Sequence, residues 1–212
     1  MLVRPRLRAR MSERWGRRLT TVVAGPGFGK TVGLLTTMED RSGRPPGTDV
    51  WLSCEPADED AGHLRAGLAQ ACGLPPESAA EGIVDWVWAQ APDAVCLVLD
   101  DVHEIPRGSA GAALMRRLVD ELPGNAHVVL ASRQRVPLPV ARLAASGQLA
   151  RIGESDLLFD EAELDAFAAA RNVDPALLAS SGGWPALAEL LATAGADLVL
   201  DYPLGGGPGQ SR

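Results

Sequence analysis

Short apolar runs alternate with longer mixed segments over the first two thirds of the chain. The apolar runs, rich in leucine and β-branched residues, cover residues 19–23, 50–54, 95–99 and 127–131. The segments between them show a helical spacing of apolar residues around positions 60–72, 80–90 and 109–122. Such short apolar runs are typical of strands buried on both faces, and strands that alternate with helices form parallel sheets. We therefore predict an α/β fold in which helices flank a parallel sheet on both sides, giving three layers.

The last third of the chain predicts helices without strands. Asp160 and Glu163 have the spacing of a capping box at the start of an alanine-rich helix. Pro185 suits the first turn of a second helix, which we expect to continue from Ala186 to Ala196. Beyond this helix the chain is dominated by glycine, a composition that forms no core. A small helical subdomain and a flexible tail are therefore expected after the α/β core.

The charge of the chain is unevenly distributed. The 212 residues carry a formal net charge of −7, yet residues 1–18 hold seven arginines against one glutamate, a local charge of +6, which leaves −13 for the remainder. An acidic body argues against direct binding of DNA, since nucleic-acid binding depends on neutralising phosphates. The basic lead could instead contact phosphates, an acidic partner or the acidic body of the same chain.

The composition favours a cytoplasmic protein. No stretch of the chain is long and apolar enough to cross a membrane, and no apolar segment follows the arginine-rich start as it would in a secretion signal. The three cysteines, Cys54, Cys72 and Cys96, are far apart and lie among apolar residues. We expect them to be reduced core residues.

The chain contains one lysine, Lys30, among 20 cationic residues. Arginine replaces lysine wherever a solvated charge is sufficient, but it does not replace a compact ammonium inside a closed loop. Lys30 stands in Ala24-Gly25-Pro26-Gly27-Phe28-Gly29-Lys30-Thr31, which fits the Walker A pattern with alanine in the first glycine position. A β-branched run precedes this segment and a helical pattern follows it, as that motif requires.

This segment predicts a phosphate-binding loop. Glycines let successive backbone N–H groups turn inward, and the following helix adds the positive end of its dipole. Lys30 would neutralise the β- and γ-phosphates, and Thr31 would place its hydroxyl at a magnesium ion. The residues expected to contact the nucleotide are Ala24, Gly25, Pro26, Gly27, Phe28, Gly29, Lys30, Thr31 and Val32.

A second motif follows the apolar run at 95–99, which leads into Asp100 and Asp101. A buried parallel strand delivers such carboxylates to the edge of the sheet where ligands bind. This arrangement is typical of a Walker B motif. Asp100 would orient Mg²⁺, and Asp101, pointing the other way along the strand, would position or activate the attacking water. The alternative is that Asp100 caps a turn before Glu104.

Arg133 is a candidate for a third functional position. It follows the apolar run at 127–131, so its backbone lies at the same edge of the predicted sheet. A guanidinium there could detect and stabilise the terminal phosphate. The alternative is a solvated surface arginine beside Arg135.

With these motifs the chain resembles the nucleotide-binding domain of the signal-transduction ATPases with numerous domains (STAND), in the type found in large LuxR-like activators of the maltose-regulator kind. The resemblance covers nearly the whole chain. It rests on Arg4-Pro5-Arg6-Leu7, Ala24 to Thr31, Val50-Trp51-Leu52-Ser53, Leu97 to His103, Leu130-Ala131-Ser132-Arg133 and Gly183-Trp184-Pro185. It implies ATP or ADP bound between a P-loop core and a helical subdomain, slow hydrolysis, and a nucleotide-dependent switch.

The resemblance also implies roles for single residues. It implies that Arg133 is the sensor arginine, that Pro185 lies beside the nucleotide, and that the segment around Arg4 runs past the adenine. The implied division is a basic lead at 1–18, a P-loop NTPase core at 19–158, a helical subdomain at 159–200 and a flexible tail at 201–212. The winged-helix, repeat and helix-turn-helix parts of such regulators are not in this sequence, so we expect a protein partner or self-association rather than direct DNA binding.

Three functions remain open at this point. The first is a slow Mg-dependent ATPase switch of a transcription-regulator-type protein, which Lys30, Thr31, Asp100 and Asp101 together favour. The second is a non-catalytic module that holds ADP and binds other proteins. The third is a small P-loop kinase or transferase, because a P-loop determines phosphate binding but not the acceptor.

Overall fold

The computed structural model describes residues 2, 4–39 and 45–201. The chain forms two compact units. The larger unit comprises residues 5–26, 30–39 and 45–157, and the smaller unit comprises residues 2, 4, 27–29 and 158–201. The expected glycine-rich tail, apart from Asp201, lies outside the described residues.

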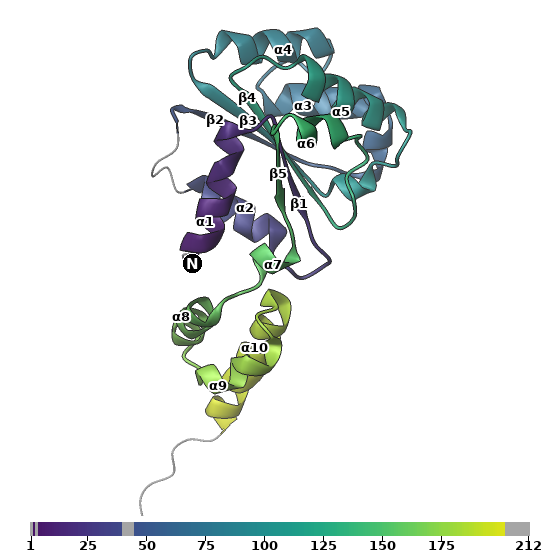
Figure 1. Ribbon diagram of the computed structural model, residues 1–212. Helices are drawn as coiled ribbons and strands as arrows, with labels where there is room; N and C mark the ends of the chain where they lie inside the picture. Colours follow the sequence, from purple (N-terminus) through teal and green to yellow (C-terminus); the bar gives the residue numbers. More distant parts are fainter. Residues whose placement is uncertain (1, 3, 40–44, 202–212) are drawn as a thin grey trace, which may run out of the picture. The chain divides into compact units, whose positions relative to one another are not determined.

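The larger unit is built on a parallel sheet of five strands (Figure 1). The strands are β1 (Leu19–Val23), β2 (Gly47–Ser53), β3 (Ala94–Asp100), β4 (Ala126–Ser132) and β5 (Leu149–Ile152). Their order across the sheet is β2-β3-β4-β1-β5, and every neighbouring pair is parallel. The sheet confirms the predicted α/β class and the four predicted strands. The sequence pattern does not predict β5, a strand of 4 residues that contains an arginine.

Helices cover both faces of this sheet, α1 and α2 on one face and α3, α4 and α5 on the other (Figure 1). The helices of the larger unit are α1 (Pro5–Ser12), α2 (Lys30–Glu39), α3 (Ala61–Ala71), α4 (Ala80–Ala89), α5 (Ala110–Glu121), α6 (Ala141–Ala145) and α7 (Glu154–Leu157). Short 3-10 turns occur at Glu13–Gly16, Pro56–Glu59 and Val102–Glu104. Helices α3, α4 and α5 confirm the three helices predicted between the strands.

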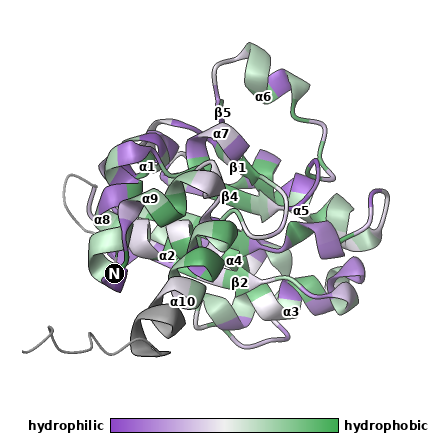
Figure 2. Ribbon diagram, turned by 90° about the horizontal axis from the view of Figure 1, so that it is seen from below, coloured by the Kyte–Doolittle hydropathy of each residue, from purple (hydrophilic) through white to green (hydrophobic). Residues whose placement is uncertain are grey.

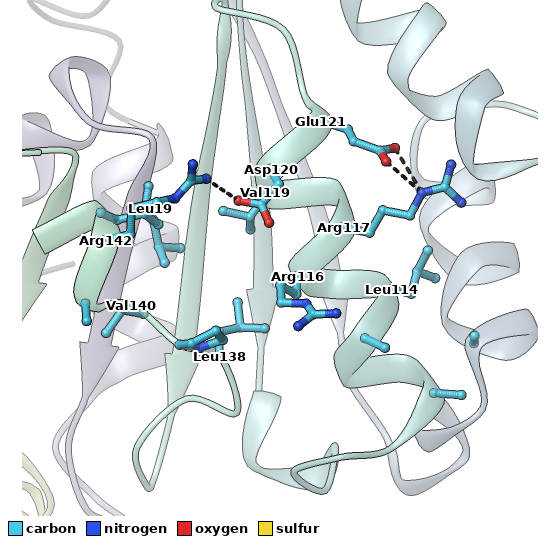
Figure 3. Close-up of a pocket in the computed structure, with 16 residues that line it drawn as sticks. Leu19, Leu114, Arg116, Arg117, Val119, Asp120, Glu121, Leu138, Val140 and Arg142 are labelled. Atoms are coloured by element: carbon cyan, nitrogen blue, oxygen red, sulfur yellow. Dashed lines mark hydrogen bonds and ion pairs between the residues drawn. The ribbon is translucent and has the colours of Figure 1, made fainter.

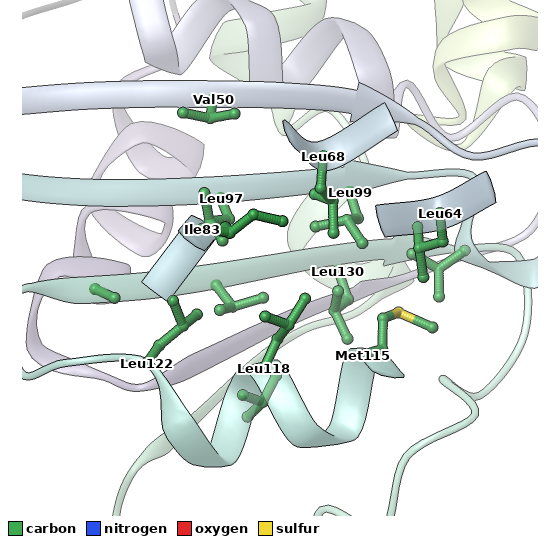
Figure 4. Close-up of a cluster of buried hydrophobic side chains, with 14 of the residues drawn as sticks. Val50, Leu64, Leu68, Ile83, Leu97, Leu99, Met115, Leu118, Leu122 and Leu130 are labelled. Carbon is green, nitrogen blue, oxygen red and sulfur yellow. The ribbon is translucent and has the colours of Figure 1, made fainter. Parts of the chain in front are cut away.

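The main core lies between the sheet and helices α3, α4 and α5 (Figure 4). Strand β3 is buried at all of its positions because it is a central strand with both faces covered. The buried side chains of this cluster include Leu64, Leu68, Ile83, Leu97, Leu99, Met115, Leu118 and Leu130. Burial of each such side chain stabilises the fold by about 2 kcal/mol, so the cluster holds the strand ends, and the residues after them, in fixed places.

The basic N-terminal lead contains a helix that the sequence pattern does not predict. Helix α1 buries Leu7 against α2, where a methyl group at Gly33 would lie 3.0 Å from Leu7 Cδ2. Arg10 on the same helix forms ion pairs with Asp156 at 3.1 Å and with Glu13 at 2.5 Å. The sequence left three partners possible for the basic lead: phosphates, an acidic partner, or acidic residues of the same chain. The described structure contains contacts of the third kind.

The smaller unit contains α8 (Glu161–Arg171), α9 (Pro175–Leu178) and α10 (Pro185–Asp201), with a 3-10 turn at Ala179–Ser181. Helix α8 begins with the predicted capping box: Glu163 N donates to Asp160 Oδ1 at 2.8 Å, and Asp160 N donates to Glu163 Oε2 at 3.2 Å. Pro185 is the first residue of α10, as predicted. The buried core of this unit consists of Phe167, Ala168, Leu178, Ala188 and Ala192.

Glu163 stabilises the smaller unit through two separate contacts. Its side chain is 4% exposed and forms an ion pair with Arg4 at 3.0 Å, in addition to its place in the capping box. We expect Glu163→Ala to destabilise this unit by about 3 kcal/mol, because a buried charge that loses its partner is costly. Glu163→Gln keeps an acceptor for the capping box and should have a smaller effect.

Amide hydrogen exchange of residues 161–171 in the full chain measures this stability for both variants. Glu189→Gln, which removes an exposed ion pair of the same unit with Arg171, serves as the control. Equal protection of α8 in Glu163→Ala and in the wild type would contradict the role assigned to Glu163.

Hydrophilic and hydrophobic residues are mixed along the helices (Figure 2). Among the residues with described positions, no helix is both long and apolar enough to cross a membrane. Cys54, Cys72 and Cys96 are buried and free, as predicted. Burial raises the pKa of Cys54 to about 12 and that of Cys72 to about 11. These two thiols therefore remain protonated and unreactive at neutral pH.

Candidate functional site

The motif residues lie at the carboxyl edge of the sheet, the edge at which open α/β sheets bind ligands. Strand β3 ends in Asp100, β4 ends immediately before Arg133, and β5 ends immediately before Gly153. Strand β1 leads into the glycine loop, and Ala24 N donates to Ser132 O at 3.3 Å. Because β3, β4, β1 and β5 are consecutive neighbours in the sheet, these strand ends form one continuous row.

Residues 24–29 form the loop between β1 and α2 that the Walker A pattern predicts, and the last two residues of the pattern, Lys30 and Thr31, begin α2. Gly27 and Gly29 have φ angles of 76° and 74°, in the left-handed region that glycine adopts without strain. Helix α2 begins at Lys30 and is 10 residues long. The first N–H groups of a helix have no partner within it and carry partial positive charge, which suits an anion.

Lys30 is buried against the loop that precedes it. The residue is 7% exposed, and Nζ donates to Ala24 O at 2.9 Å and to Gly25 O at 3.0 Å. Burial lowers the pKa of Lys30, an effect that the Asp100 carboxylate opposes and the Arg133 guanidinium reinforces. Phosphate oxygens are stronger acceptors than backbone carbonyls, so an anion in the loop would draw the ammonium toward itself.

Thr31 and Asp100 join the two motifs directly. Thr31 Oγ1 donates to Asp100 Oδ2 at 2.5 Å, and Asp101 N donates to Asp100 Oδ1 at 2.9 Å. Asp100 is 1% exposed, whereas Thr31 is open to solvent. A hydroxyl and a carboxylate are hard oxygen donors, and Mg²⁺ in nucleotide sites is held by one or two carboxylates together with phosphate oxygens and water. These two residues therefore fit a magnesium ion.

Asp101 has a backbone conformation that the strand pattern does not predict. It follows the end of β3 and has φ 53° and ψ 34°, in the left-handed region, before the turn Val102–Glu104. The expectation that strand alternation orients Asp101 is wrong, because the strand has already ended. Aspartate tolerates this region better than most residues, and such conformations occur often at functional sites. The Asp101 side chain is 40% exposed and therefore accessible to water.

His103 lies between two carboxylates in this turn. Its Nδ1 is 3.7 Å from Asp101 Oδ1, and its Nε2 is 3.4 Å from Glu104 Oε1. The side chain is 11% exposed, and neither ring nitrogen has a hydrogen-bond partner in the part of the chain that the structure describes. The ring therefore restricts the space open to the Asp101 carboxylate and places a potential donor beside it.

Arg133 is exposed just beyond β4. It lies close enough to Lys30 to contribute to the lowered pKa of that lysine. Its side chain forms no hydrogen bond or ion pair with residues 2, 4–39 or 45–201. A guanidinium without such a partner, whose charge acts on Lys30, is available to an anion in the loop.

Glu154 is a further residue of the site, and the sequence reasoning misses it. It begins α7 just after β5, and Gly25 N donates to Glu154 Oε1 at 3.1 Å. Its charge also acts on Lys30, where it opposes the lowering of the pKa. An acidic side chain thus occupies one N–H group of the predicted phosphate loop.

Replacing Glu154 with glutamine is expected to tighten the binding of ADP by about two- to fivefold. The change removes a negative charge beside the loop but keeps an acceptor for Gly25 N. Calorimetric titration measures the affinity, and Glu121→Gln, at an exposed glutamate of α5, controls for the general change of charge. Weaker binding by Glu154→Gln would show that the carboxylate supports the loop rather than competing with phosphate.

In the smaller unit, the middle of the loop packs against the start of α10. Ala186 N donates to Gly27 O at 3.0 Å. A methyl group at Gly27 would lie 2.7 Å from Ala186 Cβ and 3.1 Å from Trp184 Nε1, and one at Gly29 would lie 3.8 Å from Pro185 Cβ. Pro185 therefore lies next to the glycine turn, and Gly27 leaves no space for a side chain.

Three other residues expected at the nucleotide have different surroundings. Arg4 belongs to the smaller unit, where its guanidinium pairs with Glu163 and lies 4.6 Å from the centre of the Phe159 ring. The Phe28 ring has its centroid 6.2 Å from that of Trp184. Val32, which follows Thr31 on α2, is 61% exposed. The guanidinium of Arg4 is thus engaged within its own unit.

Among known proteins, the chain matches solved structures but no family model and no curated protein. A Walker-type ATPase of Pyrococcus abyssi has a TM-score of 0.61 and 15% identity over 95% of this chain and 68% of its own. The ORC1 protein of Aeropyrum pernix, solved in complex with DNA, has a TM-score of 0.59 and 15% identity over 95% of this chain and 61% of its own. The chain therefore has the fold of P-loop ATPases, and it spans less than two thirds of the ORC1 protein.

Proposed function

We propose that this chain is a nucleotide-binding module that holds ATP or ADP with Mg²⁺ and hydrolyses ATP slowly as a regulatory switch. The observation that carries the proposal is the junction of the two motifs, in which Thr31 bonds to Asp100 directly beside the buried Lys30. A buried ammonium, a hydroxyl and a carboxylate next to a glycine loop match the needs of a polyphosphate and its metal ion. An ordinary turn before a helix requires none of these groups.

The loop residues would bind the phosphates. The N–H groups at the start of α2 and the Lys30 ammonium would receive the β- and γ-phosphates, and phosphate oxygens would replace Glu154 at Gly25 N. Thr31 and Asp100 would hold Mg²⁺, which neutralises charge on the phosphates when it is bound. Arg133 would approach the terminal phosphate and stabilise the charge that develops on it.

Asp101 is the group best placed to act on water. Its exposed carboxylate follows Asp100 in the turn, and it would accept a hydrogen bond from the water that attacks the γ-phosphate. His103 would serve as a positioning residue, because its ring lies between Asp101 and Glu104. Without an activating partner, turnover is expected to be slow.

The finer proposal is that the module is of the STAND type found in LuxR-like regulators. The order of the motifs from Arg4 to Pro185 supports it, as does the position of Pro185 beside the glycine turn. Residues 1–18, 19–158 and 159–200 would then be the lead, the core and the helical subdomain. The nucleotide state would control assembly with a protein partner or with further copies of the chain. The charge of −13 after residue 18 supports placing DNA binding in other parts of such regulators.

Nucleotide content and turnover test the proposal. The purified protein is denatured, the released nucleotide is identified by chromatography, and phosphate release from Mg·ATP is followed over several turnovers. We expect nucleotide bound in the purified protein and slow, repeated hydrolysis. ADP retained without turnover would indicate a non-catalytic holding module, and phosphate transfer to a small acceptor would indicate a kinase. Absence of both bound nucleotide and Mg·ATP binding would overturn the proposal.

A further inference from the structure

A hollow lined by three arginines lies in the larger unit, near the phosphate loop. Its volume is about 660 Å³, and its charged residues are Arg107, Arg135 and Arg151. The ends of β1 and β5 form one wall, and the apolar segment from Val136 to Ala141 forms another. Cavities of about 300 to 1,000 Å³ are typical of small-molecule sites.

Arg151 stands at a sheet position where an apolar residue is expected. In the pairing of β1 with β5, Leu19 is opposite Leu149 and Thr21 is opposite Arg151. Alternate residues of a strand share a face, so Arg151 lies on the same face as Leu149, which packs against the main core. Further along that face the hollow opens and Arg151 is exposed. An arginine there adds charge to the hollow and little to packing.

The positive charge of this hollow has no acidic counterpart. No aspartate or glutamate lines it. Across the described ranges, Arg107, Arg135 and Arg151 form no ion pair, and the side chain of Arg107 donates to the backbone oxygen of Val136 at 3.3 Å. Three guanidiniums without carboxylates beside them give the hollow a local positive charge, which attracts anions.

A neighbouring cavity shows the opposite arrangement. It has a volume of about 1190 Å³ and shares residues 138–141 with the hollow. Two of its three arginines face carboxylates: Arg142 bonds to Asp120 at 2.8 Å, and Arg117 bonds to Glu121 at 2.9 Å (Figure 3). The charges of that cavity are largely compensated, so it offers suitable control positions.

Two residues that line the hollow are followed directly in the sequence by residues that contact the phosphate loop or Lys30. Val23 lines the hollow and is followed by Ala24, whose carbonyl accepts from Lys30. Gly153 also lines the hollow and is followed by Glu154, which accepts from Gly25 N. A ligand in the hollow would therefore contact Val23 and Gly153, the residues that precede Ala24 and Glu154 in the sequence.

We infer that the hollow is a second anion site, for a small molecule that carries at least two phosphate or carboxylate groups. Guanidinium groups bind both kinds of anion with paired hydrogen bonds, and the segment from Val136 to Ala141 provides an apolar wall for a carbon skeleton. An anion bound there shifts Glu154 and so alters the affinity of the loop for phosphates. The binding itself does not depend on the proposed nucleotide function, whereas the effect on the loop rests on it.

Titration of the full chain with pyrophosphate and, separately, with the tricarboxylate tricarballylate tests this site. Calorimetry is done without magnesium at about 0.15 M salt, where weak surface attraction is screened. The first variant, Lys30→Ala, weakens binding at the phosphate loop. The second adds Arg135→Gln and Arg151→Gln to it. The third adds Arg116→Gln and Arg142→Gln instead, as a control with the same change of charge in the neighbouring cavity. Thermal denaturation confirms that each variant is folded.

We expect at least one of the two anions to bind the hollow of the Lys30→Ala variant with the affinity that it has for the hollow of the wild type. Adding Arg135→Gln and Arg151→Gln should weaken this binding at least about tenfold, and the control pair should change it less than about twofold. The anion that binds identifies phosphate or carboxylate as the recognised group. Failure of both anions to bind the Lys30→Ala variant would overturn the inference. Pyrophosphate binding that depends on Lys30 alone would also overturn it, while leaving the proposed nucleotide function intact.

Discussion

Replacing Lys30 with alanine is expected to weaken Mg·ATP binding by about 10- to 100-fold and to abolish measurable turnover. Hydrogen bonds from a charged donor contribute about 1.5–3 kcal/mol each, and Lys30 is the only lysine in the chain. No neighbouring ammonium is therefore available to take its place. Fluorescence titration with a labelled nucleotide and a phosphate-release assay measure the two effects.

Lys30→Arg separates the charge of the lysine from its shape. The Nζ atom reaches two carbonyls within the loop, at Ala24 and Gly25, and the wider guanidinium does not fit the same space. We therefore expect Lys30→Arg to lose most of the affinity as well. The melting temperature of each variant controls for the lost contacts to the loop. Unchanged affinity and turnover in Lys30→Ala would refute the assignment of the loop.

The second large effect is expected from Asp101→Asn, which should lower kcat about 10²- to 10⁴-fold and leave Mg·ATP affinity within about twofold of the wild type. Asparagine has nearly the same shape as aspartate and tolerates the left-handed conformation of this residue. The change therefore removes the proposed base without straining the turn. Single-turnover phosphate release, compared with equilibrium binding, separates the chemical step from affinity.

Two further variants define the specificity of that result. Glu104→Gln removes the other carboxylate next to His103 and should lower kcat less than about tenfold. Asp101→Ala should reduce kcat as Asp101→Asn does, but it should also destabilise the turn by about 1 kcal/mol. Turnover that survives Asp101→Asn would assign the water-activating role to another group.

The parts of the fold that could be predicted are those whose signals are local. Strands β3 and β4 are continuous apolar runs, and α8 carries its capping box in four consecutive residues. Strand β5 and helix α1 have no such signal. Strand β5 is only Leu149–Ile152 and depends on pairing with β1, while α1 is rich in arginine and depends on the burial of Leu7. Tertiary contacts therefore decide both elements.

The candidate site divides in the same way. Lys30, Thr31 and Asp100 stand in linear motifs, and the structure brings Thr31 and Asp100 into contact. Glu154 could not be predicted, because its contact with the loop arises only from the position of β5 beside β1 in the sheet. The left-handed backbone of Asp101 could not be predicted either, since an aspartate pair after a strand does not reveal where the strand ends.

The buried position of the only lysine makes the chain unusual toward amine-reactive reagents. Acylation of side-chain amines in this protein has a single target, at 7% exposure and held by two carbonyl oxygens. A reagent reaches that amine only when the loop releases it. The rate of acylation therefore measures how often the loop opens spontaneously. Enzymatic acetylation at the same atom would remove the charge of the only lysine and would abolish phosphate binding by the loop in a single covalent step.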